Sequence, residues 1–191
     1  LPSWNGHVPN DNSSFRVLMR FYKDSWSPWL TVGYWKNNIW SSYGATNFSD
    51  GKIDYDYVVL NSFYNKWQFK IEMKRTNIIE PSPSVHKLSF SISDQRTTDN
   101  VSINDLAGDN PPEIFIPTDH FYQYSIDPEF GGDICSPTSV SMALRSYDIE
   151  VDPRQFAIDN YDHYWGIYGM WPRAVQNAAE YNLNGSVTRY R

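Results

Sequence analysis

The spacing of hydrophobic and polar positions in the first half of the chain is that of β-strands. In KWQFKIEM, residues 66–73, apolar and polar residues alternate, which places Trp67, Phe69, Ile71 and Met73 on one face. Strict alternation is typical of a half-buried antiparallel strand, so this face is expected in the core. Further strands are predicted, between turn residues, at FRVLMRFY (15–22), WLTVGYWK (29–36), IDYDYVVL (53–60) and VHKLSFSI (85–92). This series of short strands favours a β-sandwich or jelly roll.

Beyond a polar stretch at residues 94–113, the spacing becomes helical. Ser136-Pro137 and Asp152-Pro153 each combine an N-cap residue with a proline at the first helical position. Trp171-Pro172 opens a third helix, which is expected to end near YNLNG. After Ser136, the apolar residues Val140, Leu144 and Tyr147 follow at helical intervals, and SVTRYR (186–191) is expected to begin a strand. We therefore predict an α+β chain of two domains, residues 1–108 and residues 109–191.

Composition and charge restrict the possible partners. The chain has 191 residues, 40% of them hydrophobic, and a formal net charge of −6. An acidic chain without a clustered basic face argues against a nucleic-acid partner. No apolar run approaches the roughly 18 residues of a membrane span. Phosphate-loop, zincin and serine-hydrolase motifs are absent from the sequence, and we expect neither a cofactor nor a metal.

The chain has a single cysteine, Cys135, which excludes an internal disulfide. It lies in GGDICSPTS, just before the predicted helix, where backbone N–H groups and the helix dipole favour an anion. The thiolate is the reactive form of cysteine, so this placement suggests a nucleophile. The glycines Gly131 and Gly132 are expected to let the backbone turn tightly and leave the sulfur accessible. The alternative is a small buried side chain without chemistry.

The segment FYQYSIDPEFGGDICSPTSVSMAL resembles the C39-like cysteine peptidases of the papain-like superfamily. In that family a glutamine precedes a glycine-rich approach to C-G-P-T-S at the start of the central helix. Here Gln123 precedes Cys135, and residues 135–139 match the motif except that Ser136 replaces glycine. GIYGMWPRAVQNAAEYNLNG (166–185) is also similar to the family. The resemblance implies that residues 109–191 form the helical first lobe of a papain-like fold, with Cys135 as nucleophile and Gln123 as oxyanion donor.

The family's catalytic histidine has no counterpart at the expected position. His7, His86, His120 and His163 all lie outside it, and only 56 residues follow Cys135, by subtracting 135 from 191. The second, β-rich lobe is therefore expected to be missing from this chain, which is interpreted as C-terminally incomplete. A complete but inactive protein, or His163 as a substitute base, remains open.

Two other groups of residues are candidate ligand sites. DGKIDYDY (50–57) brings together Asp50, Asp54 and Asp56, but lacks the spacing of a calcium loop, so Asp50-Gly51 is expected to make a hairpin turn. The other is a possible sugar-stacking face of tryptophans, of which most are expected to be core and Trp26 and Trp29 are the best candidates for exposure. Its members are Trp26, Trp29, Trp35, Trp40 and Trp67.

The resemblance implies a secreted or cell-surface, bacterial cysteine peptidase that acts on a peptide or protein, with possible cell-wall or glycan contact through the N-terminal domain. The alternative is a non-catalytic carbohydrate- or cell-surface-binding protein with a degenerate peptidase domain.

Overall fold

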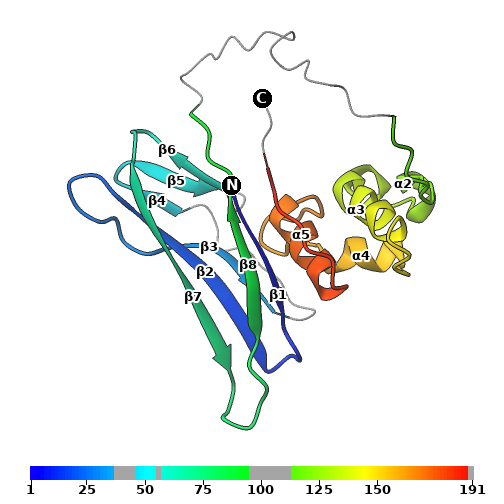
Figure 1. Cartoon of the computed structure of the whole chain (residues 1–191), viewed down its shortest axis with the longest axis horizontal. Helices are drawn as coiled ribbons and strands as arrows, with labels where there is room; N and C mark the ends of the chain where they lie inside the picture. The colour runs from blue at the N-terminus through cyan, green and yellow to red at the C-terminus, as the bar shows by residue number, and fades with distance from the viewer. Residues whose placement is uncertain (37–45, 55–56, 95–112, 189–191) are drawn as a thin grey trace.

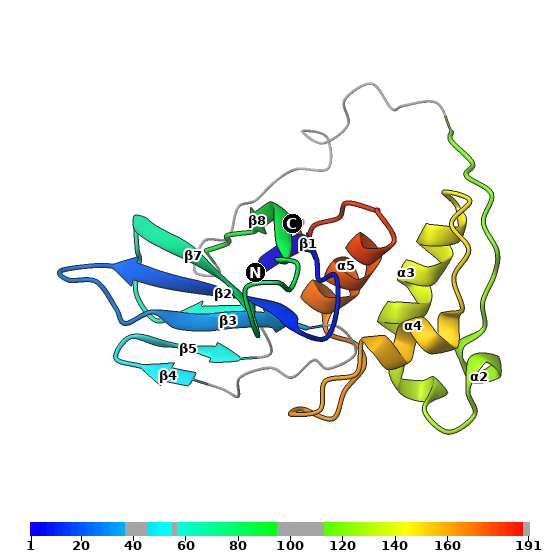
Figure 2. The same cartoon turned by 90° about the horizontal axis from the view of Figure 1, so that it is seen from below.

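The computed structural model describes residues 1–36, 46–54, 57–94 and 113–188. It is an α+β molecule, with antiparallel strands in the N-terminal part and helices after residue 113 (Figure 1). Figure 2 shows the two parts side by side, with the last helix next to the first strand. The expected boundary near residue 108 lies outside the described residues. None of the described helices reaches the length and apolar character needed to cross a bilayer.

The described strands form three antiparallel sheets, β1-β8, β3-β2-β7 and β4-β5-β6. Their bounds are β1 (Pro2–His7), β2 (Ser13–Tyr22), β3 (Leu30–Trp35), β4 (Thr46–Phe48), β5 (Gly51–Asp54), β6 (Tyr57–Leu60), β7 (Lys66–Arg75) and β8 (Ser84–Phe90). The antiparallel, sheet-rich character of the N-terminal part is confirmed. Because the described sheets have two or three strands each, the finer assignment to a sandwich or jelly roll stays a prediction.

The core of the sheet part is built on β2, whose alternate side chains point inward. Phe15 and Val17 are fully buried, and Met19 is nearly so. Trp4 of β1 lies directly on β3 at Gly33, where a Cβ atom would come within 1.9 Å of the indole ring. Position 33 therefore has to be glycine for β1 to approach this closely.

The segment 53–60, predicted as one strand, forms two. β5 pairs with β6 in a hairpin that places Asp54 opposite Tyr57, while residues 55–56 lie outside the described structure. The preceding hairpin places Phe48 opposite Gly51, so Asp50 is in its turn as expected. The single-strand prediction was wrong because Ile53, Tyr55 and Tyr57 alternate with Asp54 and Asp56 as they would in one strand, so the sequence pattern shows no break between β5 and β6.

The alternation in β7 is confirmed, but the prediction that its apolar face is core was wrong. Each apolar residue of β7 lies opposite an inward-pointing residue of β2, for example Phe69 opposite Met19. Nevertheless Trp67 is 42% exposed, Phe69 53% and Met73 49%. The cause is position in the sheet: β7 is an edge strand among the described strands, and only its Ile71 packs against the buried cluster.

The helical part consists of short helices, whose starts largely follow the sequence signals. They are α2 (Gln123–Ile126), the 3₁₀ turn η1 (Gly131–Asp133), α3 (Cys135–Arg145), α4 (Pro153–Asp159) and α5 (Trp171–Glu180). The predicted cap of α4 is confirmed, since the Asp152 carboxylate accepts hydrogen bonds from the N–H groups of Arg154 and Gln155. α5 begins at Trp171 as predicted and is followed by Asn182 in the left-handed conformation, with φ of 64°.

The start of α3 lies two residues before the predicted one. Cys135 is the first helical residue, and Ile134 rather than Ser136 is the cap residue. Tyr147 is exposed because α3 ends at Arg145, before the predicted stripe reaches it. The fully buried side chain of Ile134 anchors this start in the core, which outweighs the capping preference of Ser136.

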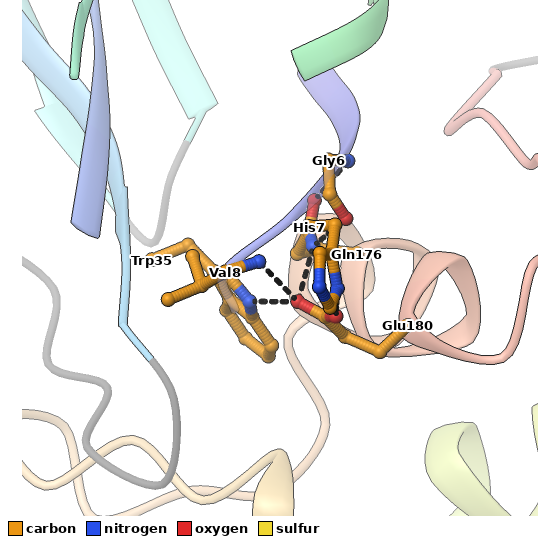
Figure 3. A network of polar contacts seen from close by, with 6 residues as sticks. All are labelled: Gly6, His7, Val8, Trp35, Gln176 and Glu180. Carbon is orange, nitrogen blue, oxygen red and sulfur yellow. Dashed lines mark hydrogen bonds and ion pairs between the residues drawn. The ribbon is translucent and has the colours of Figure 1, made fainter. Parts of the chain in front are cut away.

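Helix α5 packs on β1 and joins the two parts of the molecule (Figure 3). A β-bulge between Asn5 and Gly6 shifts the pairing of β1 with β8. The Gln176 side chain bonds both peptide groups of Gly6: its Oε1 accepts from the Gly6 N–H at 2.9 Å, and its Nε2 donates to the Gly6 carbonyl at 2.8 Å. A side-chain amide thus takes the place of a neighbouring strand.

One turn further along α5, Glu180 completes the same network. Its carboxylate accepts from the Trp35 indole N–H at 2.8 Å and from the Val8 N–H at 3.3 Å, and it pairs with His7 at 2.6 Å. Figure 3 shows these groups converging on Glu180 from β1 and β3.

The chain after α5 continues along β1 without regular secondary structure. The Gly185 N–H donates to Asn5 Oδ1, and the Val187 N–H donates to Ser3 Oγ. The strand expected at residues 186–191 is therefore not found in residues 186–188, and residues 189–191 lie outside the described structure.

Candidate active site

Cys135 lies at the exposed N-terminus of α3 and is not in a disulfide. The Thr138 N–H makes the first intrahelical bond, to the Ile134 carbonyl at 2.9 Å. The N–H groups of Cys135 and Ser136 precede that bond, and helix geometry gives them no intrahelical acceptor. The side chain of the cap residue, Ile134, has no atom that can accept a hydrogen bond. The sulfur is therefore next to backbone donors that the helix itself does not use.

Gln123, the first residue of α2, contacts the loop that leads to Cys135. Its Nε2 donates to the Gly131 carbonyl at 2.6 Å, four residues before the cysteine. Gly131 also allows α2 and η1 to approach, because a Cβ there would lie 2.9 Å from the Gln123 carbonyl oxygen and from Tyr124 Cα. Gly132 has no such crowding. The structure thus places the glutamine amide at the cysteine loop.

Asp127 fixes the other end of this loop. Its buried carboxylate accepts from the N–H groups of Glu129 and Phe130, and pairs with Arg154 of α4 at 2.8 Å. Burial alone would raise the pKa of Asp127, but these two N–H groups and the Arg154 guanidinium lower it below its ordinary value of 3.8. Asp127 is therefore held ionised, and it ties the cysteine loop to the start of α4.

Aromatic stacking supports the same loop. The Phe130 ring contacts the Arg154 guanidinium, 5.4 Å from its centroid, and the nearly parallel Tyr168 ring, whose centroid is 4.7 Å away. Tyr168 in turn contacts Tyr161 at 4.7 Å. This stack connects the segment before Cys135 with the loop 161–169.

That loop is organised around a fully buried ion pair between Asp162 and Arg173 of α5, at 2.5 Å. The other carboxylate oxygen of Asp162 accepts from the N–H groups of Tyr164 and Trp165. Gly166 then adopts φ of 65°, which glycine reaches without strain. These contacts fix the conformation of the loop that carries Tyr168.

Residues 115–191 match the model of the Peptidase_C39 like family. The resemblance carried by Cys135–Ser139 is confirmed for this part of the chain, residues 115–191, here termed the C39-like segment. No curated protein and no solved structure matches the chain. The match supports a peptidase-like family for these residues, while the two-domain papain-like arrangement stays a prediction.

The histidines of the sheet part lie at its junction with the C39-like segment. His7, which ends β1, pairs with Glu180, and His86 of β8 hydrogen-bonds Asn184 at 2.8 Å. Both rings are therefore held at the junction of the two parts.

His120 lies near the C-terminal half of α3, whereas Cys135 is at the N-terminus of that helix. Its neighbour Asp119 bonds Arg145, and its neighbour Phe121 donates to Met142 Sδ at 3.5 Å. Met142 is seven residues beyond Cys135, which is about 10 Å along the helix axis.

His163 lies on the exposed loop 161–169, with its ring 4.9 Å from that of Tyr161. It lines a cleft of about 650 Å³ between the sheet part and the helices α4 and α5. The lining of that cleft includes neither Cys135 nor Gln123. The structure therefore gives no contact that pairs His163 with the cysteine.

The carboxylates of Asp50 and Asp54 are already bonded to neighbouring side chains. Asp50 accepts from the Tyr64 hydroxyl at 2.8 Å and pairs with Lys23, while Asp54 pairs with Lys52. The described residues contain no group of three or more metal-ligating side chains, and Asp56 lies outside them.

Trp26 and Trp29, the best candidates for sugar stacking, are half-buried, and cationic side chains already lie over their rings. The Arg20 guanidinium lies 4.6 Å from the Trp26 ring and 4.5 Å from the Trp29 ring, and Lys70 also lies over Trp29 at 4.9 Å. Trp35 is buried and bonds Glu180, and Trp40 is outside the described residues. Exposure of Trp67 was not predicted.

The sequence reasoning did not identify Asp127, Arg154, Asp162 and Arg173. Both aspartates carry a recognisable signal, since an aspartate whose side chain accepts from N–H groups two and three residues on is typical of a turn. Their arginine partners lie 27 and 11 residues away, a separation that no local pattern reveals.

Proposed function

We propose that Cys135 is the nucleophile of a cysteine peptidase. Its thiolate attacks the scissile carbonyl carbon, the carbon–nitrogen bond breaks, and the amine leaves with a proton from a general acid. Water then hydrolyses the thioester and regenerates the thiol. The observation that carries this proposal is the exposed cysteine at a helix start whose cap residue has no side-chain acceptor, within the C39-like segment.

Gln123 and the Cys135 N–H would stabilise the oxyanion. The Gln123 amide has two hydrogens, of which the bond to the Gly131 carbonyl uses one, so the second remains for a substrate oxygen. One such donor contributes about 3 kcal/mol to transition-state stabilisation in related acyl transfer. The same side chain also positions the loop that precedes the cysteine.

The general base is the open part of the proposal. It is either His163, for which the described residues show no contact with Cys135, or a histidine outside residues 1–191. The native reading frame distinguishes these. A Gly-His followed by Asp or Asn within roughly a hundred residues after Arg191 favours the second, in line with the separations known for papain-like sites.

Secretion, a bacterial origin and cell-wall contact rest on the family resemblance alone and stay part of the proposal. The alternative is a glycan-binding protein with a degenerate peptidase domain. It has less support, because the Arg20 guanidinium already makes cation–π contacts with the rings of Trp26 and Trp29. A glycan array combined with the acylation test below separates the two proposals: glycan binding that is lost in Trp29→Ala, in a protein whose Cys135 is not acylated, would favour the binding protein.

The proposal is tested by trapping the acyl-enzyme. Incubation with p-nitrophenyl acetate should transfer the acetyl group to Cys135 and release p-nitrophenol, with the modified peptide located by mass spectrometry. Cys135→Ala should lose the modification, and Gln123→Ala should slow it about 100-fold, as for other oxyanion donors. Ser136→Gly, which restores the family residue, serves as the matched control and should stay active. Acetylation of lysines alone, at equal rates in all four proteins, would refute the nucleophile.

A further inference from the structure

Among the described strands, β7 has a hydrogen-bonded neighbour on one side only. Its ten residues pair with β2 over their whole length, without a bulge. On its other side no described strand is hydrogen-bonded. An unpaired edge presents a row of backbone N–H and C=O groups that can accept another strand.

The side chains of β7 make this edge suited to burial. Trp67, Phe69 and Met73 share one face and are each about half exposed. The residues of β2 opposite them are almost completely buried. The apolar face of the sheet therefore extends from β2, where it is covered, onto β7, where it is about half exposed. Exposed apolar rows of this kind mark interaction surfaces.

We propose that β7 pairs antiparallel with β7 of a second copy of this chain, about a twofold axis through Ile71. In this register Ile71 lies opposite its own copy, and Phe69 lies opposite Met73. On the other face Lys70 lies opposite Glu72, and this contact occurs twice because of the symmetry. Between residues 69 and 73, apolar side chains therefore meet apolar ones and Lys70 meets an acid, while Lys74 lies opposite Gln68 and Trp67 opposite Arg75.

Neighbouring registers lack this complementarity. A shift of one residue brings the apolar face of one strand against the polar face of the other. An axis through Lys70 places that lysine opposite itself, and an axis through Glu72 places that glutamate opposite itself. Directly opposed like charges destabilise a strand pair. These registers are therefore disfavoured. An axis through Phe69, which places Trp67 opposite Ile71 and Lys66 opposite Glu72, is the competing self-pairing, and the Lys66→Glu variant distinguishes the two.

The charged groups are already arranged for this contact. Lys70 and Glu72 form an ion pair at 2.7 Å on the same strand, and Arg16 of β2 also bonds Glu72 at 2.6 Å. Both hydrogen bonds lower the pKa of the Glu72 carboxyl, first that from Lys70 and then that from Arg16, so it is ionised at neutral pH. In the dimer, two such pairs lie side by side with opposite orientation, and the four charges alternate in sign.

The test is the oligomeric state, measured by sedimentation velocity over a wide range of concentration. The unmodified chain should dimerise. Lys70→Glu and Glu72→Lys should each weaken the dimer at least about tenfold, because each places two like-charge pairs across the axis. The double swap Lys70→Glu/Glu72→Lys should restore it. Lys66→Glu, the matched control on the same strand but beyond the self-paired residues, should not weaken it.

Mixing the two single variants gives the sharper result. Glutamates at 70 and 72 of one copy then face lysines at 72 and 70 of the other, so a heterodimer should form although neither variant dimerises alone. Circular dichroism establishes that both variants are folded. If Glu72→Lys fails to fold for want of its bond with Arg16, Phe69→Glu and Met73→Lys provide the equivalent pair. An unmodified chain that stays monomeric, or a mixture of folded variants that does not associate, overturns the proposal and indicates that the lysines of β7 protect the edge from pairing.

Discussion

Helices α3 and α4 both have a proline in the first turn, but only α4 has a side-chain cap. At α4 the Asp152 side chain accepts two of the otherwise unpaired backbone N–H groups. At α3 the corresponding residue is Ile134, which accepts none and instead anchors the helix in the core. One helix start is thus satisfied by its own side chain, while the other leaves its donors beside the Cys135 sulfur.

The difference separates a stabilising feature from a candidate reactive one. A side-chain cap contributes about 1 kcal/mol to stability. Omitting it at α3 keeps the positive end of the helix and its N–H groups for an anion, whether a thiolate or an oxyanion. Stability at that start comes from elsewhere, through Ile134, Asp127 and the bond between Gln123 and Gly131. Substitutions at these residues separate the two roles.

The largest expected effect concerns α5, whose first turn, like that of α3, lacks a side-chain cap. Arg173→Met should destabilise the protein by about 3–5 kcal/mol, because it leaves the fully buried Asp162 without its partner. Thermal or urea unfolding measures the loss. The double variant Arg173→Met/Asp162→Leu should be more stable than the single one; equal instability would show that the pair is not what holds the loop.

The next effect is on the chemistry of α3. Ser136→Asp places a negative charge in the first turn, next to Cys135, and should slow alkylation by iodoacetamide about tenfold at pH 7 by opposing the thiolate. Ser136→Asn has nearly the same size without the charge and should alkylate at the normal rate. Equal slowing by both variants would indicate steric hindrance rather than electrostatics.

The corresponding change at α4 should affect stability alone. Asp152→Ala should cost about 1 kcal/mol, and Asp152→Ser, which retains a capping oxygen, should recover most of it. Neither variant should alter the alkylation rate of Cys135. A change in that rate would contradict this expectation and would mean that the starts of α3 and α4 are coupled.

The smallest effect is a pH dependence at Asp127. Because its pKa is lowered on folding, its contribution to stability is present above its unfolded value, near 3.8, and is lost as pH falls through the folded value. Asp127→Asn should therefore reduce the melting temperature at pH 6 and approach the unmodified protein at pH 2–3. A constant difference between the two proteins from pH 6 to pH 2 would contradict the ion pair with Arg154.

The sequence was sufficient for features that depend on local spacing. The alternation of residues 66–73, the cap at Asp152 and the position of Cys135 at a helix start all follow from neighbouring residues. Strand β1 was missed because Pro2, Asn5 and Gly6 weaken its strand pattern. It is stabilised by partners far along the chain, including Gln176 and Gly185.

Burial was less predictable than periodicity. The same alternation gives a buried face in β2 and a half-exposed one in β7, because only the strand order decides which lies at the edge. Similarly, no local pattern indicates that Gln176 of α5 replaces a strand partner of Gly6. These outcomes depend on contacts more than 40 residues apart, which single-sequence patterns do not encode.

The central claim, that the start of α3 activates Cys135, is tested most directly by comparing its alkylation in two states of the same chain. Iodoacetamide labelling at pH 6 should be at least about tenfold faster in the folded protein than in urea, because the N–H groups of the first helical turn lie beside the sulfur only when α3 is formed. A folded protein that reacts no faster than the unfolded chain would contradict the claim.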